Sequence, residues 1–135
     1  MTIAIDTNVI VRLFVRDDEH QHQATRRLVT QATAADEPIL ILLCALLEPA
    51  RVLRSRYKLD KASIAAAFGQ LLESRGVIIE HEPTLEEALY LWSQYATADF
   101  ADCLVLARAA QLGRTRFVTF DAAAAKLPKA ELLVV

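Results

Sequence analysis

Long apolar runs, a cysteine framework and glycine-rich loops are all missing from this sequence. Its 135 residues include only two cysteines, three glycines and four prolines. No apolar run reaches the roughly 18–20 residues of a membrane-spanning helix, and the N-terminus lacks a charged start followed by a secretory apolar stretch. Cys44 and Cys103 form no C-x-x-C pair. We therefore expect a soluble cytoplasmic protein whose two thiols are reduced and buried.

The sequence also lacks the motifs of two common catalytic machineries. It has no G-x-S-x-G motif, and Gly69, Gly76 and Gly113 are too scattered to form a phosphate-binding loop. The net charge of −2 argues against a broad basic surface for nucleic acid. Serine-nucleophile, P-loop and tight nonspecific nucleic-acid-binding mechanisms are therefore disfavoured.

Short apolar segments alternate with helical patterns along the whole chain. A hydrophobic content of 54% is ample for a core, and the length predicts one domain spanning residues 1–135. Strands are predicted at 3–5, 39–42, 77–79, 117–119 and 132–135, and helices at 9–15, 20–35, around position 48, and at 61–74, 85–95 and 99–112. This alternation indicates an α/β fold, a three-layer α/β/α sandwich with a short parallel sheet.

Three local signals fix the predicted helices more closely. Asp60 is expected to cap the helix that begins at position 61. Thr84 with Glu87 reads as a capping box for the next helix. The inner face of the helix at 20–35 is expected to carry the apolar residues at its helical spacing, namely Ala24, Leu28, Val29 and Ala32.

Acidic residues stand at positions that an ordinary domain does not require. Asp6 and Asp121 each follow a predicted strand, so both belong to the carboxyl edge of the sheet, where ligands bind in such folds. Asp99 and Asp102 are three apart and share the N-terminal end of a helix. Glu48 is the only charge in the apolar segment 38–50, where an ionised carboxylate is costly without a partner. Together these acids predict a cage for Mg²⁺ or Mn²⁺.

Each acid also has an ordinary structural interpretation. Asp6 and Asp121 are good helix N-caps, and Asp99 with Asp102 suits an N-cap followed by a first-turn acid. Glu48 could pair with an arginine of the same helix, Arg51 or Arg54. The joint pattern is therefore more informative than any single residue.

The basic residues are dominated by arginine, at eleven of fifteen. Arginine suits bidentate phosphate contact, but it also forms ion pairs on ordinary helices. The candidate phosphate contacts are Arg12, Arg16, Arg51 and Arg54. The three histidines are expected on the surface, because none is spaced to share a site with another.

Four short motifs now carry a resemblance to a known family. They are Ile-Asp-Thr-Asn-Val-Ile-Val-Arg at 5–12, Leu-Leu-Glu at 46–48 with Val-Leu at 52–53, Ala-Asp-Phe-Ala-Asp-Cys-Leu-Val-Leu-Ala at 98–107, and Val-Thr-Phe-Asp at 118–121. In order and spacing they resemble a PIN domain, and in size and motif style the chain is similar to the VapC toxins of bacterial toxin–antitoxin pairs. The resemblance spans essentially the whole sequence.

The resemblance implies a Mg²⁺- or Mn²⁺-dependent endoribonuclease. It matches Asp6, Glu48, Asp102 and Asp121 to the family's acidic quartet, and Asp99 to a further metal-binding acid. It gives Thr7, Asn8 and Thr119 supporting or substrate-orienting roles. One or two metal ions would activate a water for attack on an RNA phosphodiester. Because the acids crowd together, at least one should have a raised pKa without the cation.

The resemblance also implies partners. A VapB-like antitoxin would cover the cleft and place an amphipathic helix on the apolar helices between about residues 43 and 74, and the toxin is expected to form a homodimer. Two other functions stay open. One is an aspartyl phosphatase or phosphoacceptor domain, which the Asp-Thr-Asn sequence at 6–8 disfavours because it lacks an Asp-x-Asp motif. The other is a noncatalytic module whose acids dock a basic partner.

Overall fold

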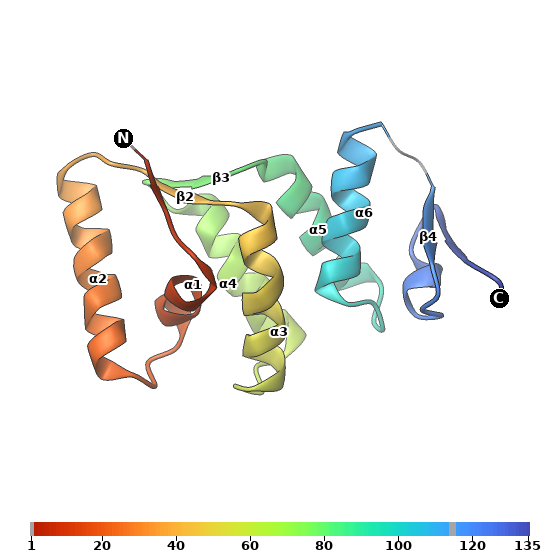
Figure 1. The fold of residues 1–135 in the computed structure, drawn as a ribbon, viewed down its shortest axis with the longest axis horizontal. Coiled ribbons are helices and arrows are strands. Elements are labelled where there is room, and N and C mark those ends of the chain that lie inside the picture. The colour runs from red at the N-terminus through yellow and green to blue at the C-terminus, as the bar shows by residue number, and fades with distance from the viewer. Residues whose placement is uncertain (1, 114–115) are drawn as a thin grey trace. The chain divides into compact units, whose positions relative to one another are not determined.

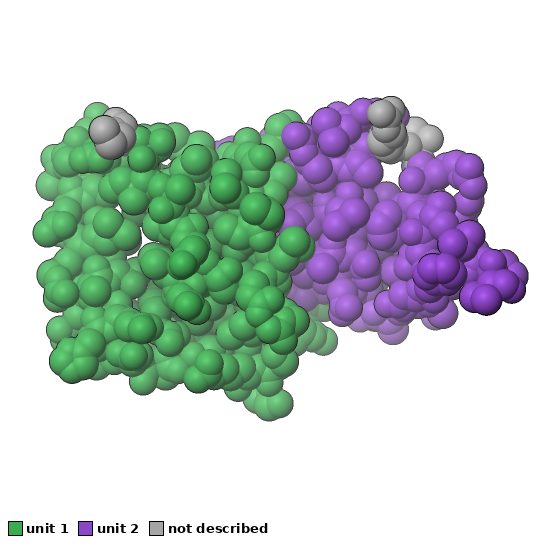
Figure 2. Space-filling view, in the orientation of Figure 1, with its two compact units in different colours: residues 1–81 green, residues 82–135 purple. Residues whose placement is uncertain are grey.

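The computed structural model describes residues 2–113 and 116–135. Helices and short strands alternate along the chain (Figure 1). The chain divides into two compact units, residues 1–81 and 82–135, which Figure 2 shows in different colours. The predicted α/β class with short parallel strands is confirmed.

The first unit contains a three-stranded parallel sheet. Strands β1 (Ile3–Ala4), β2 (Ile39–Ile41) and β3 (Val77–Ile79) lie in the order β1-β2-β3. Ile39 is paired with Ile3 on one side and with Val77 on the other. The central strand is the most buried of the three, which explains why its residues are a continuous β-branched and leucine run rather than an alternating pattern.

The helices of the first unit are α1 (Thr7–Phe14), α2 (Glu19–Ala34), α3 (Leu47–Ser55) and α4 (Lys61–Glu73), with a 3-10 turn, η1 (Leu43–Leu46), before α3. The helices after Asp6 and Asp60 begin at predicted polar caps. The Asp60 carboxylate accepts a hydrogen bond from the Ser63 amide at 2.8 Å, so the predicted cap of α4 is confirmed. Asp18 caps α2 in the same way.

The buried face of α2 differs from the prediction. Ala32 is buried, and Leu28 and Val29 are half-buried, as expected. Ala24, however, is exposed, and the neighbouring Thr25 is buried at 7% exposure. The buried face of α2 therefore includes a threonine in place of the neighbouring alanine. A pattern of apolar residues alone does not predict a polar residue at a core position.

The core of the first unit gathers residues from its helices and from the central strand. Its fully buried side chains include Ile10, Ile41, Leu46, Leu53, Ile64 and Phe68. Phe68 of α4 lies against Phe14 at the end of α1, with ring centroids 6.3 Å apart. Burying each of these large side chains contributes about 1.5–3 kcal/mol relative to exposing it.

The second unit consists of two helices and a two-stranded parallel sheet. Helix α5 (Glu82–Gln94) packs on α6 (Phe100–Gln111), with the Trp92 and Phe100 rings in an edge-on contact at 5.3 Å. Strand β4 (Phe117–Thr119) pairs in parallel with β5 (Ala130–Leu132), and a 3-10 turn, η2 (Ala124–Lys126), lies between them. This unit presents an acid from the start of α6 and another from the end of β4.

Three local predictions were wrong. Thr84 lies inside α5 and is fully buried, so it does not begin a capping box at 84–87. The last strand ends at Leu132, and Val134 and Val135 are exposed rather than paired. Cys103 is buried as expected, but Cys44 is exposed.

None of the helices in the described part of the chain has the length and apolarity needed to cross a membrane.

Candidate metal centre

Two of the predicted acids lie at the N-terminal end of α6. Asp99 is the N-cap residue, yet its side chain makes no capping bond to the first turn in the described structure. Asp102 follows in the first turn. The helix dipole and the free amides at this end favour negative charge. Asp99 therefore stabilises the helix end by its position while its oxygens stay available for a ligand.

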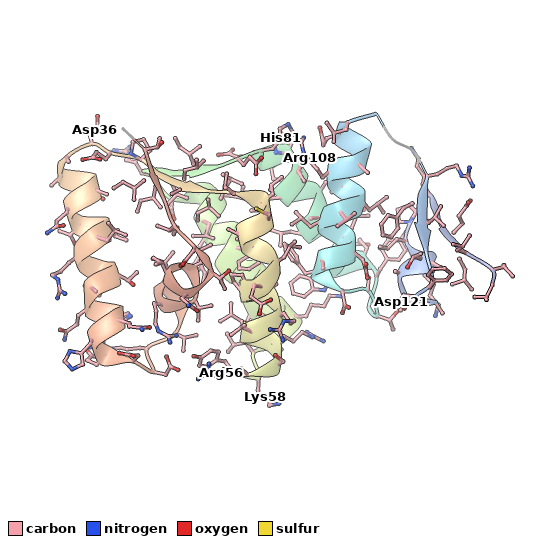
Figure 3. All side chains as sticks on the ribbon, in the orientation of Figure 1. Asp36, Arg56, Lys58, His81, Arg108 and Asp121 are labelled. Atoms are coloured by element: carbon pink, nitrogen blue, oxygen red, sulfur yellow. The ribbon has the colours of Figure 1, made fainter. Side chains whose placement is uncertain are left out.

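The third acid is held by the turn after β4 (Figure 3). The Asp121 amide donates to the Thr119 hydroxyl oxygen at 3.0 Å, and one Asp121 carboxylate oxygen accepts from the Ala123 amide at 2.9 Å. Thr119 thus fixes the backbone from which Asp121 projects. The supporting role expected of Thr119 has this physical basis.

Asp99, Asp102 and Asp121 form one cluster of carboxylates. One oxygen from each lies within 4.8 Å of the others. Two oxygens on opposite sides of a Mg²⁺ ion lie about 4 Å apart, since each is about 2.1 Å from the metal. The cluster therefore has the donor type and nearly the spacing of a hard divalent cation site. Asp99 and Asp121 are exposed and Asp102 is half-buried, so the site is open to solvent on one side.

The electrostatics of the cluster centre on Asp102. Partial burial raises the pKa of the Asp102 carboxyl, and repulsion from Asp99 and Asp121 raises this pKa further. The expectation that one of the crowded acids has a raised pKa is confirmed. A cation among the three carboxylates would remove the cause of the repulsion, so proton release should accompany its binding.

Asp6 lies in the first unit, directly after β1. Its carboxylate accepts a hydrogen bond from the Val9 amide at 3.2 Å and so caps α1. Thr7 and Asn8 occupy the first turn of this helix, Thr7 half-buried and Asn8 exposed. The ordinary interpretation of Asp6 as an N-cap is therefore realised, and its exposure leaves the side chain accessible to a ligand as well.

Glu48 does not have the buried environment expected from its apolar neighbours. It lies in the first turn of α3, as predicted, but 49% of its side chain is exposed. The Arg51 guanidinium binds both of its oxygens and lowers the pKa of the Glu48 carboxyl. Pro49 follows in the same turn, where its missing amide costs no helical hydrogen bond. The argument from burial was therefore wrong, and the predicted Arg51 pair is present.

The four candidate phosphate-binding arginines differ in whether an acidic side chain already pairs with them. Arg12 is only 14% exposed and is held by Asp17, Gln21 and Tyr57. Arg16 and Arg51 are exposed but paired with Glu19 and Glu48. Among residues 2–113 and 116–135, only Arg54 of these four has no ion pair.

The partner of Arg16 was missed in the sequence. Glu19 accepts two hydrogen bonds from Arg16, at 2.8 and 2.9 Å, and one from Gln23 at 3.0 Å. These donors lower the pKa of the Glu19 carboxyl to about 2. The spacing of three residues between Arg16 and Glu19 is a signal that would have found the pair.

Comparison with known proteins assigns the chain to a family. The search among curated proteins gives no match. The family model of the PIN domain matches residues 3–130, a range that contains all five predicted acids and reaches into both units. The α/β elements and short parallel sheets agree with the three-layer α/β/α fold of this family. The chain therefore belongs to the PIN domain family, whose members are generally nucleases with metal-binding acidic residues.

Proposed function

We propose that this protein is a Mg²⁺- or Mn²⁺-dependent endoribonuclease of the cytoplasm and the toxin of a VapBC-type toxin–antitoxin pair. The observation that carries the proposal is the cluster of Asp99, Asp102 and Asp121 in a PIN domain chain. The toxin role rests on the similarity of the four sequence motifs to VapC proteins.

The proposal assigns metal binding to these three acids and, from the family resemblance, to Asp6 and Glu48 of the first unit. Asp6 and Asp102 are the direct metal ligands in this proposal, and Glu48, Asp99 and Asp121 bind directly or through water, because Mg²⁺ commonly keeps several waters. Glu48 must exchange its Arg51 partner for the cation to take part.

The proposed chemistry is hydrolysis of an RNA phosphodiester. When bound, the metal ion lowers the pKa of a water molecule and neutralises charge on the leaving oxygen. The carboxylates hold the ion and help to take the proton from that water. Thr119 keeps Asp121 in place through its hydroxyl. Thr7 and Asn8 are assigned to substrate orientation at the start of α1.

The proposed protein partners are a VapB-like antitoxin and a second copy of this chain. The proposed docking region is the apolar helices between about residues 43 and 74. Their C-terminal end, at Gln70, Leu71 and Ser74, lines a cavity of about 720 Å³ that α2 and the starts of β2 and β3 also bound. Its walls include Phe14, Val29 and Leu71. Apolar grooves of this kind accept the apolar face of an amphipathic helix.

A cleavage assay tests the enzymatic proposal. Wild-type protein and the variants Asp6→Asn and Asp102→Asn are incubated with a mixed RNA pool and Mn²⁺, and the cut ends are sequenced. Glu86→Gln is the matched control, since it makes a carboxylate-to-amide change at an exposed position of α5 outside the cluster.

The proposal expects the wild type and Glu86→Gln to cut RNA, and both site variants to lose at least about 100-fold in rate. Chelation of the metal should abolish cutting by the wild type. Absence of cleavage together with absence of Mn²⁺ binding by calorimetry would reject the nuclease and favour a noncatalytic docking module.

A further inference from the structure

Two adjoining hollows lie along α2 in the first unit, away from the acidic cluster in sequence. The first, of about 310 Å³, is lined by Arg16, His22, Gln23, Arg26 and Arg27. The second, of about 270 Å³, shares His22 and Arg26 with it and extends to Arg12. Because His22 and Arg26 line both hollows, we treat the two together and call them the α2 groove; its charged lining residues are arginines.

The acids beside the α2 groove are already engaged. Asp17 pairs with Arg12 at 3.1 Å, and Glu19 pairs with Arg16 at 2.8 Å. Asp18 accepts from the Gln21 amide as the cap of α2. These contacts neutralise the two arginines of the α1–α2 turn and hold them in place. They leave no acid at this turn to pair with the arginines further along α2.

Arg26 and Arg27 are the uncompensated charges of the groove. Both are exposed, and neither has an acidic partner in the part of the chain that the structure describes. His22 precedes Arg26 by four residues, and Gln23 precedes Arg27 by four, so each pair lies on one side of α2. His22 is held in place at the junction of the two hollows, with its Nδ1 3.2 Å from the Arg12 carbonyl oxygen.

The chemistry of the α2 groove suits a phosphate. A guanidinium offers a planar fork of donors and no acceptor, and it matches two oxygens of one phosphate. The Gln23 side-chain amide, which donates one N–H to Glu19, has a second N–H in the same lining. A ligand that carries several negatively charged phosphate groups at short intervals could accept hydrogen bonds from both Arg26 and Arg27.

We propose that Arg26 and Arg27 bind backbone phosphates of single-stranded RNA beside the bond that is cut, an inference that rests on the proposed nuclease function. Helix α1 begins directly after Asp6 and reaches the lining of the groove at Arg12, about 9 Å further along the helix. This rise corresponds to about three phosphates of a stacked strand. With a net charge of −2, the chain lacks a broad attractive field, so local contacts of this kind must supply the affinity.

The test measures RNA binding by fluorescence anisotropy over a range of salt concentrations. All proteins carry Asp6→Asn to prevent cutting, and Mn²⁺ is present. Arg26→Ala with Arg27→Ala is compared with Arg75→Ala, an exposed arginine of the same unit outside the groove. The RNAs are an oligomer of about twelve nucleotides, long enough to reach the groove, and a trinucleotide that is too short.

The double alanine variant should bind the long RNA several-fold more weakly, and the slope of log K against log[salt] should fall in magnitude by about 1.4, or 0.7 per lost phosphate. Trinucleotide binding should not change, and neither should either property of Arg75→Ala. The Arg26→Lys with Arg27→Lys variant should keep the salt slope while losing part of the affinity, because it keeps the charge but not the fork. Thermal melting confirms that each variant is folded.

Other results would overturn the inference. Unchanged affinity and slope in the double alanine variant would remove the groove from RNA binding, while cleavage by the wild type would still support the nuclease. Loss of binding to polyaspartate with RNA binding intact would assign the arginines to an acidic protein partner instead. Conversely, the double alanine variant could show a reduced salt slope while the wild type cuts no RNA. This result would support RNA binding by the α2 groove and reject the nuclease function.

Discussion

The Arg51 guanidinium binds both carboxylate oxygens of Glu48 on the exposed side of α3. The positively charged side chain of Arg51 is therefore already bound to an acid that the family resemblance assigns to the metal site. The pair is local, three residues apart on one helix, and it forms within the first unit alone. Metal binding by Glu48 therefore competes with an ion pair instead of filling an empty position.

Replacing Arg51 should make the proposed site easier to load. In Arg51→Ala, the Mn²⁺ concentration for half-maximal RNA cleavage should fall by about two- to fivefold, the effect expected of an exposed ion pair. Arg54→Ala is the control, because Arg54 lies one turn on and pairs with no acid in the described residues. An equal fall in both variants would show that general charge, and not the Glu48 pair, sets the metal requirement.

The raised pKa of Asp102 predicts a pH-dependent stability. A carboxyl whose pKa is higher in the folded than in the unfolded protein favours folding when protonated, and this contribution is lost as the pH rises through the folded-state pKa. Without metal, Asp102→Asn should therefore raise the melting temperature at pH 7, with the gain disappearing at low pH. Thermal melts in chelator across this range measure the effect.

Mn²⁺ provides the complementary measurement on the same variant. The ion should stabilise the wild type at neutral pH, since it binds the folded cluster and not the unfolded chain. Asp102→Asn should show a smaller shift, while Glu86→Gln should behave as the wild type. A Mn²⁺ shift of the same size in all three proteins would place metal binding elsewhere.

The end of α2 contains a residue whose backbone favours glycine. Asp36, labelled in Figure 3, has φ 54°. The amides of Asp36 and Glu37 donate to the carbonyls of Thr33 and Ala32 as the helix ends. Asp36→Gly should stabilise the protein by about 0.5–1 kcal/mol, because relief of left-handed strain exceeds the added freedom of the unfolded chain. Asp36→Ala should give no such gain. Urea unfolding of both variants tests this.

The ring contact between α5 and α6 should hold the second unit together. Phe100 is 3% exposed and lies against Trp92, one residue after Asp99 in the acidic cluster. Phe100→Ala should cost about 3–5 kcal/mol of unfolding free energy. Hydrogen exchange should show the loss first in α5 and α6. Loss of protection confined to residues 1–81 would contradict this assignment.

The elements were predictable from local chemistry where a polar cap stood next to an apolar pattern. Asp6 and Asp60 each cap the helix that follows, as a short side chain with an acceptor oxygen does. Thr84 was misleading, because Glu82 and Pro83 already begin α5. Proline is common in the first turn of a helix, so Pro83 was the better indicator of where α5 begins.

The candidate site was predictable in its residues more than in its environments. The spacing of Asp99 and Asp102, and the strand before Asp121, correctly indicated three acids that meet. Glu48 was misjudged because a run of apolar neighbours in sequence does not reveal which side of a helix a residue faces. Pro49, Ala50 and Leu53 turn inward, and Glu48 turns outward. Arg12 donates a hydrogen bond to the Tyr57 hydroxyl, and this contact was not predictable because Tyr57 is distant in sequence.

The exposure of Cys44 makes the native protein suitable for single-site labelling. Cys103 is buried, so a maleimide dye should react selectively at the 3-10 turn before α3. The dye would sit four residues from Glu48, where exchange of Arg51 for a cation should change its surroundings. The natural sequence thus offers a fluorescence reporter of metal loading at this acid, with no substitution required.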